Sequence, residues 1–243
     1  WYVWPRINLT APDLSSTQRR TMSSTQRRTM SSNIGVMGHP IGHTKSPVFQ
    51  QAGLDELGIN ETLEAWDVTP DELEEKVATF RARDFLAACV TLPHKQAVIP
   101  LVDELTEAAE AVGAVNWIFN RDGKLVGHNT DSSGFLRALG EKAGFDPKGV
   151  DAVVFGAGGA ARAIVYALKL AGVARLTIAN RTVSKAEALA SDFSEGKFKP
   201  DAIGLGRDEL ANCAPYATLL VNATSLGMAG GPAEMATPIL ADM

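Results

Sequence analysis

The stretch 153–163, VVFGAGGAARA, constrains the fold of this chain more than any other. Three apolar residues, a glycine-rich turn and a run of helix-forming residues follow one another directly, an order that predicts a buried strand, a tight turn and a helix. Gly156, Gly158 and Ala161 fit the G-x-G-x-x-G/A pattern, in which a helix N-terminus presents its N–H groups to a pyrophosphate. Close packing of a strand and a helix without a ligand is the alternative interpretation.

The segment after the next strand indicates which dinucleotide would bind. A strand predicted over 175–179 ends at Asn180-Arg181-Thr182, where an NAD site would carry Asp or Glu for the ribose hydroxyl. Arginine suits a 2′-phosphate instead, and Lys185 follows closely; an exposed arginine at a strand end is the alternative. We therefore predict NADP as the cofactor, bound by these residues: Gly156, Ala157, Gly158, Gly159, Ala160, Asn180, Arg181, Thr182 and Lys185.

Composition excludes several classes of protein. The net charge of -5 over 243 residues argues against a nucleic-acid partner. No apolar run reaches the roughly 18 residues that would cross a membrane. Two cysteines, far apart in sequence, favour a reducing cytoplasm, and the four histidines do not cluster with other ligand residues, so we expect no metal site. Whether the chain is a monomer or a homodimer stays open.

The first 32 residues differ in character from the rest. The sequence SSTQRRTM at 15–22 is repeated unchanged at 23–30, and neither copy has apolar periodicity. We predict that residues 1–32 form a disordered tail. The alternatives are a mis-assigned start and, because the segment is rich in Arg, Ser and Thr, an organelle-targeting sequence.

A loop upstream carries two candidate ligand hydroxyls. Residues 38–47, GHPIGHTKSP, are too rich in glycine and proline for regular structure and include Thr44 and Ser46. Ser46 precedes Pro47, a favoured first helical residue, so capping of a helix over 46–57 is the alternative role for Ser46.

Two further segments place polar side chains beside predicted strands. A strand over 87–92 ends before Pro93, which puts Lys95 at the sheet edge where ligands of α/β proteins usually bind. Asn116 interrupts an apolar strand over 113–119, so it either satisfies backbone groups or faces a ligand. Lys95 has the alternative of being an ordinary surface lysine.

Asp131 follows a predicted hairpin. A turn at 120–123 joins the strand over 113–119 to a return strand over 124–126, and a helix is predicted over 134–143. Asp131 lies between that strand and that helix. It is either a helix cap or a group that faces a ligand.

Periodicity elsewhere predicts an α/β fold. We expect helices over 69–83 and 104–112 and strands over 198–205 and 218–222, the last of them buried. A doubly wound sheet normally carries further strands beyond this point, so we expect the nucleotide domain to be incomplete.

Together these motifs resemble the shikimate dehydrogenase family, which includes shikimate/quinate dehydrogenases, from about Asn33 onwards. The segments that carry the resemblance follow in the family's order and spacing: 38–47 (GHPIGHTKSP), 90–95 (VTLPHK), 113–116 (GAVN), 129–131 (NTD), 156–161 (GAGGAA), 180–182 (NRT) and 222–225 (NATS). The resemblance implies an α/β substrate-binding catalytic domain over 33–131 and a Rossmann-type, parallel-sheet NADP domain over 132–243, incomplete at its C-terminus.

The resemblance also implies an activity and roles for residues. The activity is NADP-dependent reversible reduction of 3-dehydroshikimate to shikimate, a step of chorismate and aromatic amino acid biosynthesis. Lys95 and Asp131 would be the catalytic pair, and Glu107 would approach the nicotinamide. The implied substrate-binding residues are Thr44, Ser46, Thr91, Asn116 and Asp131.

Departures from the family pattern leave two alternatives. Trp117 stands where family members often have threonine, beside Asn116, so a quinate/shikimate dehydrogenase of altered specificity is one alternative. Family members add a strand and helices that bring a glutamine to the substrate, and we expect residues 33–243 to contain neither. A truncated, non-catalytic NADP-binding fragment is therefore the other alternative.

Overall fold

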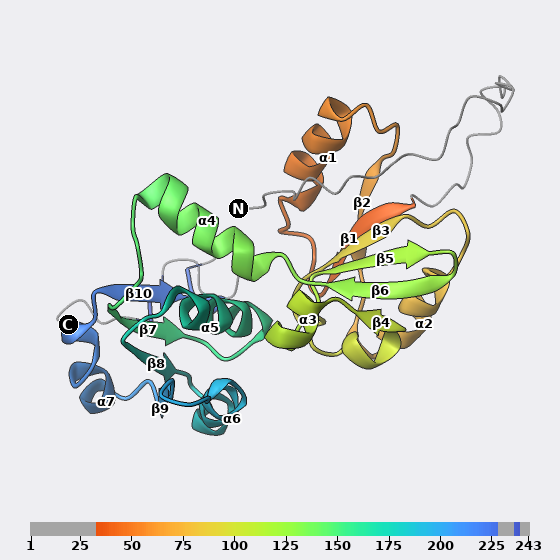
Figure 1. Ribbon diagram of the computed structural model, residues 1–243. Coiled ribbons are helices and arrows are strands. Elements are labelled where there is room, and N and C mark those ends of the chain that lie inside the picture. Colours follow the sequence, from red (N-terminus) through yellow and green to blue (C-terminus); the bar gives the residue numbers. More distant parts are fainter. Residues whose placement is uncertain (1–32, 228–235, 239–243) are drawn as a thin grey trace, which may run out of the picture.

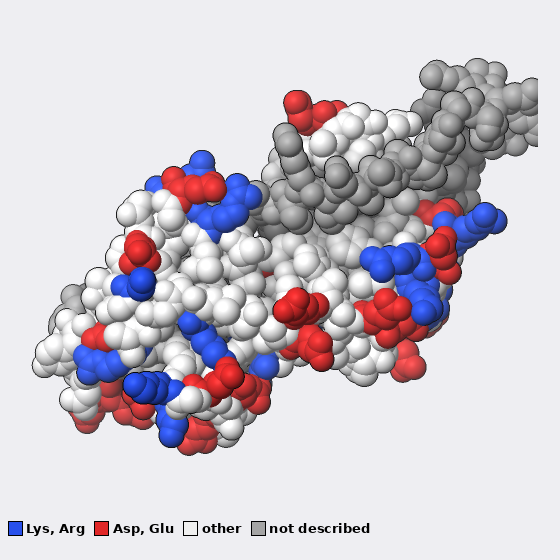
Figure 2. Space-filling view, viewed as in Figure 1, with Lys and Arg blue, Asp and Glu red and all other residues white. Residues whose placement is uncertain are grey.

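The computed structural model describes residues 33–227 and 236–238, so the predicted disordered tail lies outside the described residues. Two β-sheets follow one another along the chain, each with its own helices (Figure 1). We call them the six-stranded half and the four-stranded half. On the face shown in Figure 2, basic and acidic side chains are interspersed over both halves.

The six-stranded sheet has the order β2-β1-β3-β5-β6-β4. Strands β1, β2 and β3 are parallel, whereas β5 runs antiparallel to both β3 and β6. Its strands and helices are β1 (Ile34–Gly38), α1 (Ser46–Glu56), β2 (Leu63–Asp67), α2 (Leu73–Thr79), β3 (Ala87–Val90), β4 (Glu104–Leu105), α3 (Glu107–Val112), β5 (Trp117–Arg121) and β6 (Lys124–His128).

Two helix predictions in this half are wrong at their boundaries. The helix expected over 104–112 begins at Glu107, because residues 104–105 pair with β6 as strand β4. Thr106 caps α3 by accepting the Ala109 N–H at 3.3 Å. The helix expected over 69–83 begins as a 3-10 turn and its α-helical part, α2, ends at Thr79.

The hairpin between β5 and β6 has the expected turn. Arg121 pairs with Lys124, so Asp122 and Gly123 alone make the connection. Both have positive φ, 54° and 89°, which is the backbone of a type I′ turn. This turn sets the register of the two strands.

The four-stranded sheet is entirely parallel, with the order β10-β7-β8-β9. This half confirms the expected Rossmann-type region. Strand β10 is not buried as expected: it lies at the edge of the described sheet, and Leu220 is 39% exposed. The elements are β7 (Asp151–Phe155), α5 (Gly159–Ala171), β8 (Arg175–Ala179), α6 (Val183–Phe193), β9 (Asp201–Ile203), α7 (Arg207–Ala211) and β10 (Leu219–Asn222).

Helix α4 (Asp131–Ala143) joins the two halves and packs against α5 (Figure 1). It begins at Asp131, three residues before the expected start, so Asp131 is its first helical residue. The boundary expected between 131 and 132 therefore falls at the beginning of this helix.

Half-buried Gly123 and exposed Gly53 separate the conformational cost of a side chain from its steric cost. A Cβ at Gly123 or at Gly53 would meet nothing within 4 Å. We expect Gly123→Ala to lower the free energy of unfolding by about 1 kcal/mol because of its positive φ. Gly53→Ala, within α1, should raise it by about 0.5–1 kcal/mol. Urea unfolding of both variants checks these two predictions. Changes of the same sign in the free energy of unfolding would contradict them.

Candidate active site

Four strand ends of the six-stranded half meet at one edge of its sheet. The parallel strands β1 and β3 end there, and β5, which is antiparallel to β3, begins there. The Val90 N–H donates to the Asn116 carbonyl, and the Asn116 N–H donates to the His128 carbonyl at the end of β6. The sheet topology therefore brings together the segments that carry Thr91, Lys95, Asn116 and Asp131.

An ion pair between Lys95 and Asp131 lies at this edge. Lys95 Nζ donates to Asp131 Oδ2 at 2.6 Å. The side chains are only 12% and 19% exposed, so water screens their attraction less than it screens an exposed pair. The structure thus brings the two predicted catalytic residues into direct contact.

Asn116 holds the other carboxylate oxygen. Its Nδ2 donates to Asp131 Oδ1 and to Thr130 Oγ1, both at 2.9 Å, and its Oδ1 accepts the Thr130 N–H at 2.9 Å. Asn129 accepts the Asp131 N–H and donates to the Ala114 carbonyl. The orientation of Asp131 is therefore fixed by two buried amide side chains.

Thr44 and Ser46 lie in the loop that leaves the same edge and at the start of α1. Both are half-buried. Ser46 is not the N-cap: it is the first residue of α1, and its N–H donates to Thr44 Oγ1 at 3.2 Å. Thr91 is half-buried beside Gly38, where a Cβ would come within 2.5 Å of the Thr91 methyl group.

Trp117 does not lie in the site. Its side chain is 6% exposed and belongs to the core cluster of Ile34, Val36 and Leu54. Its ring stacks on Phe119 at 6.2 Å between centroids. Successive strand residues point to opposite faces, so the residue after Asn116 turns away from Asp131.

A groove of about 490 Å3 connects the two halves. The six-stranded half contributes five residues around Lys95, and the four-stranded half contributes the glycine turn and the ends of β8 and β10. The lining residues are Thr91, Leu92, Pro93, Lys95, Gln96, Gly156, Ala157, Gly158, Gly159, Ala160, Ile164, Asn180, Asn222, Ala223, Thr224 and Ser225.

The glycines of the turn have different neighbours. Gly156 has a φ of 113°, and a Cβ there would lie 3.0 Å from the Ala223 carbonyl oxygen. A Cβ at Gly158 would meet nothing within 4 Å, so this glycine leaves open space in the groove. A Cβ at Gly159 would come within 2.8 Å of Lys95 Cβ. The absence of a side chain at Gly159 makes room for the Lys95 stem.

The remaining predicted residues lie outside the lining of this groove. Arg181, Thr182 and Lys185 are exposed where the chain passes from β8 into α6. Glu107 is exposed in the first turn of α3. Their roles stay predictions.

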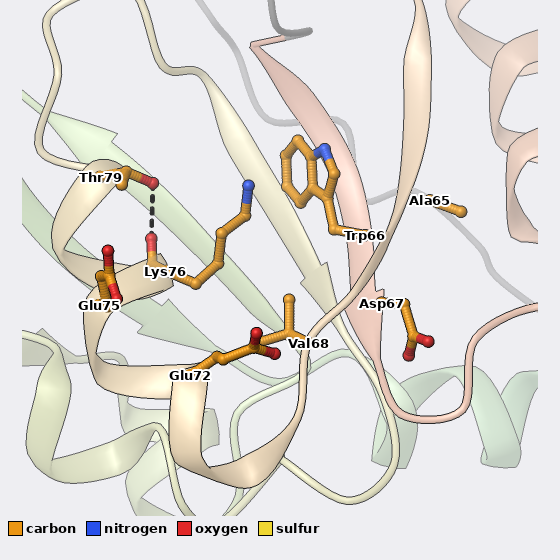
Figure 3. Close-up of a pocket in the computed structure, with 8 residues that line it drawn as sticks. All are labelled: Ala65, Trp66, Asp67, Val68, Glu72, Glu75, Lys76 and Thr79. Carbon is orange, nitrogen blue, oxygen red and sulfur yellow. Dashed lines mark hydrogen bonds between the residues drawn. The ribbon is translucent and has the colours of Figure 1, made fainter.

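A second hollow, of about 480 Å3, lies between β2 and α2 (Figure 3). Lys76 Nζ lies 4.1 Å from the centroid of the Trp66 ring, and burial lowers the pKa of this lysine. Glu72 already accepts bonds from the Thr69 N–H and hydroxyl. None of the predicted site residues lines this hollow.

Sequence reasoning missed several residues of the site. Asn129 and Thr130 orient Asp131 and Asn116, although the sequence indicated no role for them beyond their place in the segment 129–131. Gln96, Ile164 and residues 222–225 line the groove. The small polar residues that follow the strand at 218–222 were a usable signal, because parallel strands end at a common edge.

Family models and known relatives match this chain in sequence. Residues 36–118 match the model of the shikimate dehydrogenase substrate-binding domain, and residues 139–227 match that of shikimate/quinate 5-dehydrogenase. A shikimate dehydrogenase (NADP(+)) of Methanopyrus kandleri is 46% identical over 196 residues, which is 80% of this chain and 68% of that protein. The chain belongs to the shikimate dehydrogenase family.

Solved structures of the family have the same fold. The shikimate 5-dehydrogenase of Listeria monocytogenes, in complex with shikimate and NAD, is 35% identical with a TM-score of 0.72. The match covers 84% of this chain and 72% of that one. The enzyme of Thermus thermophilus, in complex with NADP(H) and shikimate, is 38% identical with a TM-score of 0.68, covering 80% and 69%.

Asn116 tests the buried amide network. We expect Asn116→Ala to lower the free energy of unfolding by about 2–3 kcal/mol, because the buried Thr130 N–H loses its acceptor and Asp131 a donor. The near-isosteric Asn116→Asp keeps the acceptor but sets a second carboxylate against Asp131. At neutral pH, Asn116→Asp should therefore lower the free energy of unfolding by more than Asn116→Ala does. In acid this decrease should become smaller. Urea unfolding at two pH values measures both, and a wild-type stability of Asn116→Asp would contradict the network.

Proposed function

We propose that this chain catalyses the NADP-dependent reversible reduction of 3-dehydroshikimate to shikimate, the reaction of its shikimate dehydrogenase relatives. The main observation in support of this proposal is the Lys95–Asp131 ion pair, which lies beside the groove that the glycine turn lines. We further propose that residues 33–131 form the substrate domain and residues 132–243 the NADP domain.

The charges of this pair suit reduction of a ring ketone. NADPH, when bound, supplies the hydride that reaches the carbonyl carbon. The Lys95 ammonium stabilises the negative charge that develops on the oxygen and gives it a proton. In the reverse direction Lys95 takes the hydroxyl proton, so its neutral form is the base. Asp131 keeps the ammonium at the site and accepts a hydrogen bond from the substrate hydroxyl.

The remaining predicted substrate ligands divide into two groups. Thr44, Ser46 and Thr91 are half-buried and carry hydroxyls suited to a polyol ring and its carboxylate. Asn116 is fully buried, and both N–H donors of its amide are already engaged. We therefore propose that Asn116 acts on the substrate mainly by orienting Asp131.

The cofactor assignment rests on the end of β8. Asn180 lines the groove, and no acidic residue follows it before Lys185, so the exposed Arg181 and Lys185 are suited to a 2′-phosphate. Relatives differ in the nucleotide they were solved with: NADP(H) in the Thermus enzyme and NAD in the Listeria enzyme. We propose NADP for this chain.

The structure bears differently on the two alternatives. The core position of Trp117 removes the reason for expecting quinate specificity. The four-stranded half and the groove would be present in a non-catalytic NADP-binding fragment too, and turnover distinguishes such a fragment from an enzyme.

None of the helices in residues 33–227 is long and apolar enough to cross a membrane. A cytoplasmic location and a monomeric or homodimeric state stay predictions.

Lys95→Met tests the catalytic pair. We expect kcat for NADP-dependent oxidation of shikimate to fall about 10³-fold, within the range for loss of a general acid–base group. NADPH affinity, measured by fluorescence titration, should stay within about twofold. Lys148→Met, an exposed lysine in the turn before β7, is the matched control and should leave kcat unchanged. Wild-type turnover in Lys95→Met would exclude the catalytic role. Absence of turnover in the wild type, with NADPH bound, would favour the non-catalytic alternative.

Arg181→Ala tests recognition of the 2′-phosphate. Loss of a charge-assisted contact should weaken NADP binding about tenfold and leave NAD binding within about twofold. Isothermal titration with each nucleotide measures the ratio. Equal weakening of both nucleotides would remove Arg181 from 2′-phosphate recognition.

A further inference from the structure

Arg162 joins the two halves at a point outside the lining of the groove. It lies in the first turn of α5, and its side chain is 15% exposed. Its Nε donates to the Val112 carbonyl, at the end of α3, at 2.9 Å. Its Nη1 donates to Asp192 of α6 at 2.6 Å. One guanidinium therefore ties α3 of the six-stranded half to α5 and α6 of the four-stranded half.

The contact is shaped for an arginine. Gly113 has a φ of 66°, and a Cβ there would lie 2.5 Å from Arg162 Nη2, so the guanidinium packs directly on the backbone. The Phe193 ring lies 5.4 Å from Cζ. Val112, Ala114 and Ala163, which are sequence neighbours of Gly113 and Arg162, are fully buried in one core cluster. A planar, permanently charged group whose donors lie on separate nitrogens in a fixed fork meets these demands, whereas a lysine ammonium carries all its donors on one nitrogen and lacks that spacing.

The residues after Gly113 lead directly to the ion pair. The Ala114 carbonyl accepts from Asn129, whose side chain holds the Asp131 N–H. The Val115 N–H donates to the Lys95 carbonyl at 2.7 Å. The Asn116 side chain holds Asp131 Oδ1. A shift of this connection would therefore move both members of the pair.

The glycine turn lies immediately before Arg162 in the chain. α5 begins at Gly159, which contacts the Lys95 stem, and Arg162 follows three residues later. We propose that Arg162 is a positioning residue that fixes the Lys95–Asp131 pair relative to the turn, and so sets the distance over which hydride is transferred. This inference rests on the proposed function.

Kinetics of Arg162→Met test the inference. Its kcat should fall about 10- to 100-fold, the range for a small misplacement of reacting groups. The deuterium isotope effect on kcat, with NADPH deuterated at the transferred position, should rise. Affinities for NADPH and for shikimate, each measured alone, should stay within about twofold. Arg162→Lys should recover part of kcat.

Arg175→Met is the matched control. Arg175 pairs with Asp151 at the start of strands β7 and β8, and this variant should behave as wild type.

Amide hydrogen exchange is the second measurement. In Arg162→Met, exchange should accelerate at the amides of Val115 and Thr130 and not across the β7–β8 core. A wild-type kcat and isotope effect would overturn the inference, as would acceleration throughout the chain, which indicates a merely structural role. If the wild type shows no turnover, the proposed function fails, and hydrogen exchange alone tests the contact made by Arg162. Faster exchange confined to Val115 and Thr130 in Arg162→Met then supports the positioning contact. Unchanged protection in that variant overturns it.

Discussion

The ion pair between Lys95 and Asp131 is the interaction around which the site is assembled. Its two residues follow different strands, and a shielded charge pair is stable only where its remaining hydrogen-bonding groups are satisfied. The buried amide of Asn116, set at the start of an antiparallel strand, meets that need. The mixed direction of the six-stranded sheet therefore has a structural consequence: it returns the chain to the edge where the pair forms.

Much of the fold followed from local patterns. The strand, turn and helix at 151–171 and the hairpin at Asp122 and Gly123 were predictable because backbone conformation there depends on a few small residues. The boundaries of α2, α3 and α4 were not. Residues 104–105 pair with β6, a contact distant in sequence that overrides their helical spacing.

The ion pair of the site was predictable in its members and not in its connections. Their places at the ends of predicted strands made Lys95 and Asp131 candidates, and the family resemblance named them as a pair. Their distance, and the roles of Asn129 and Thr130, depend on which strands are neighbours. Trp117, in contrast, was expected near the substrate and does not lie there. Its place beside Asn116 in sequence suggested a pocket residue, yet strand alternation turns its side chain into the core.

The space left by Gly159 has a consequence for exchanging parts between relatives. This glycine belongs to a nucleotide-binding motif by sequence, but the atoms it accommodates are those of Lys95 in the other half. A chimera that joins the six-stranded half of one relative to the four-stranded half of another would have to form this contact anew, between a lysine stem from one parent and a glycine from the other. Exchange of the two halves therefore depends on this junction, and a partner half that carried a side chain in place of Gly159 would displace the Lys95 stem.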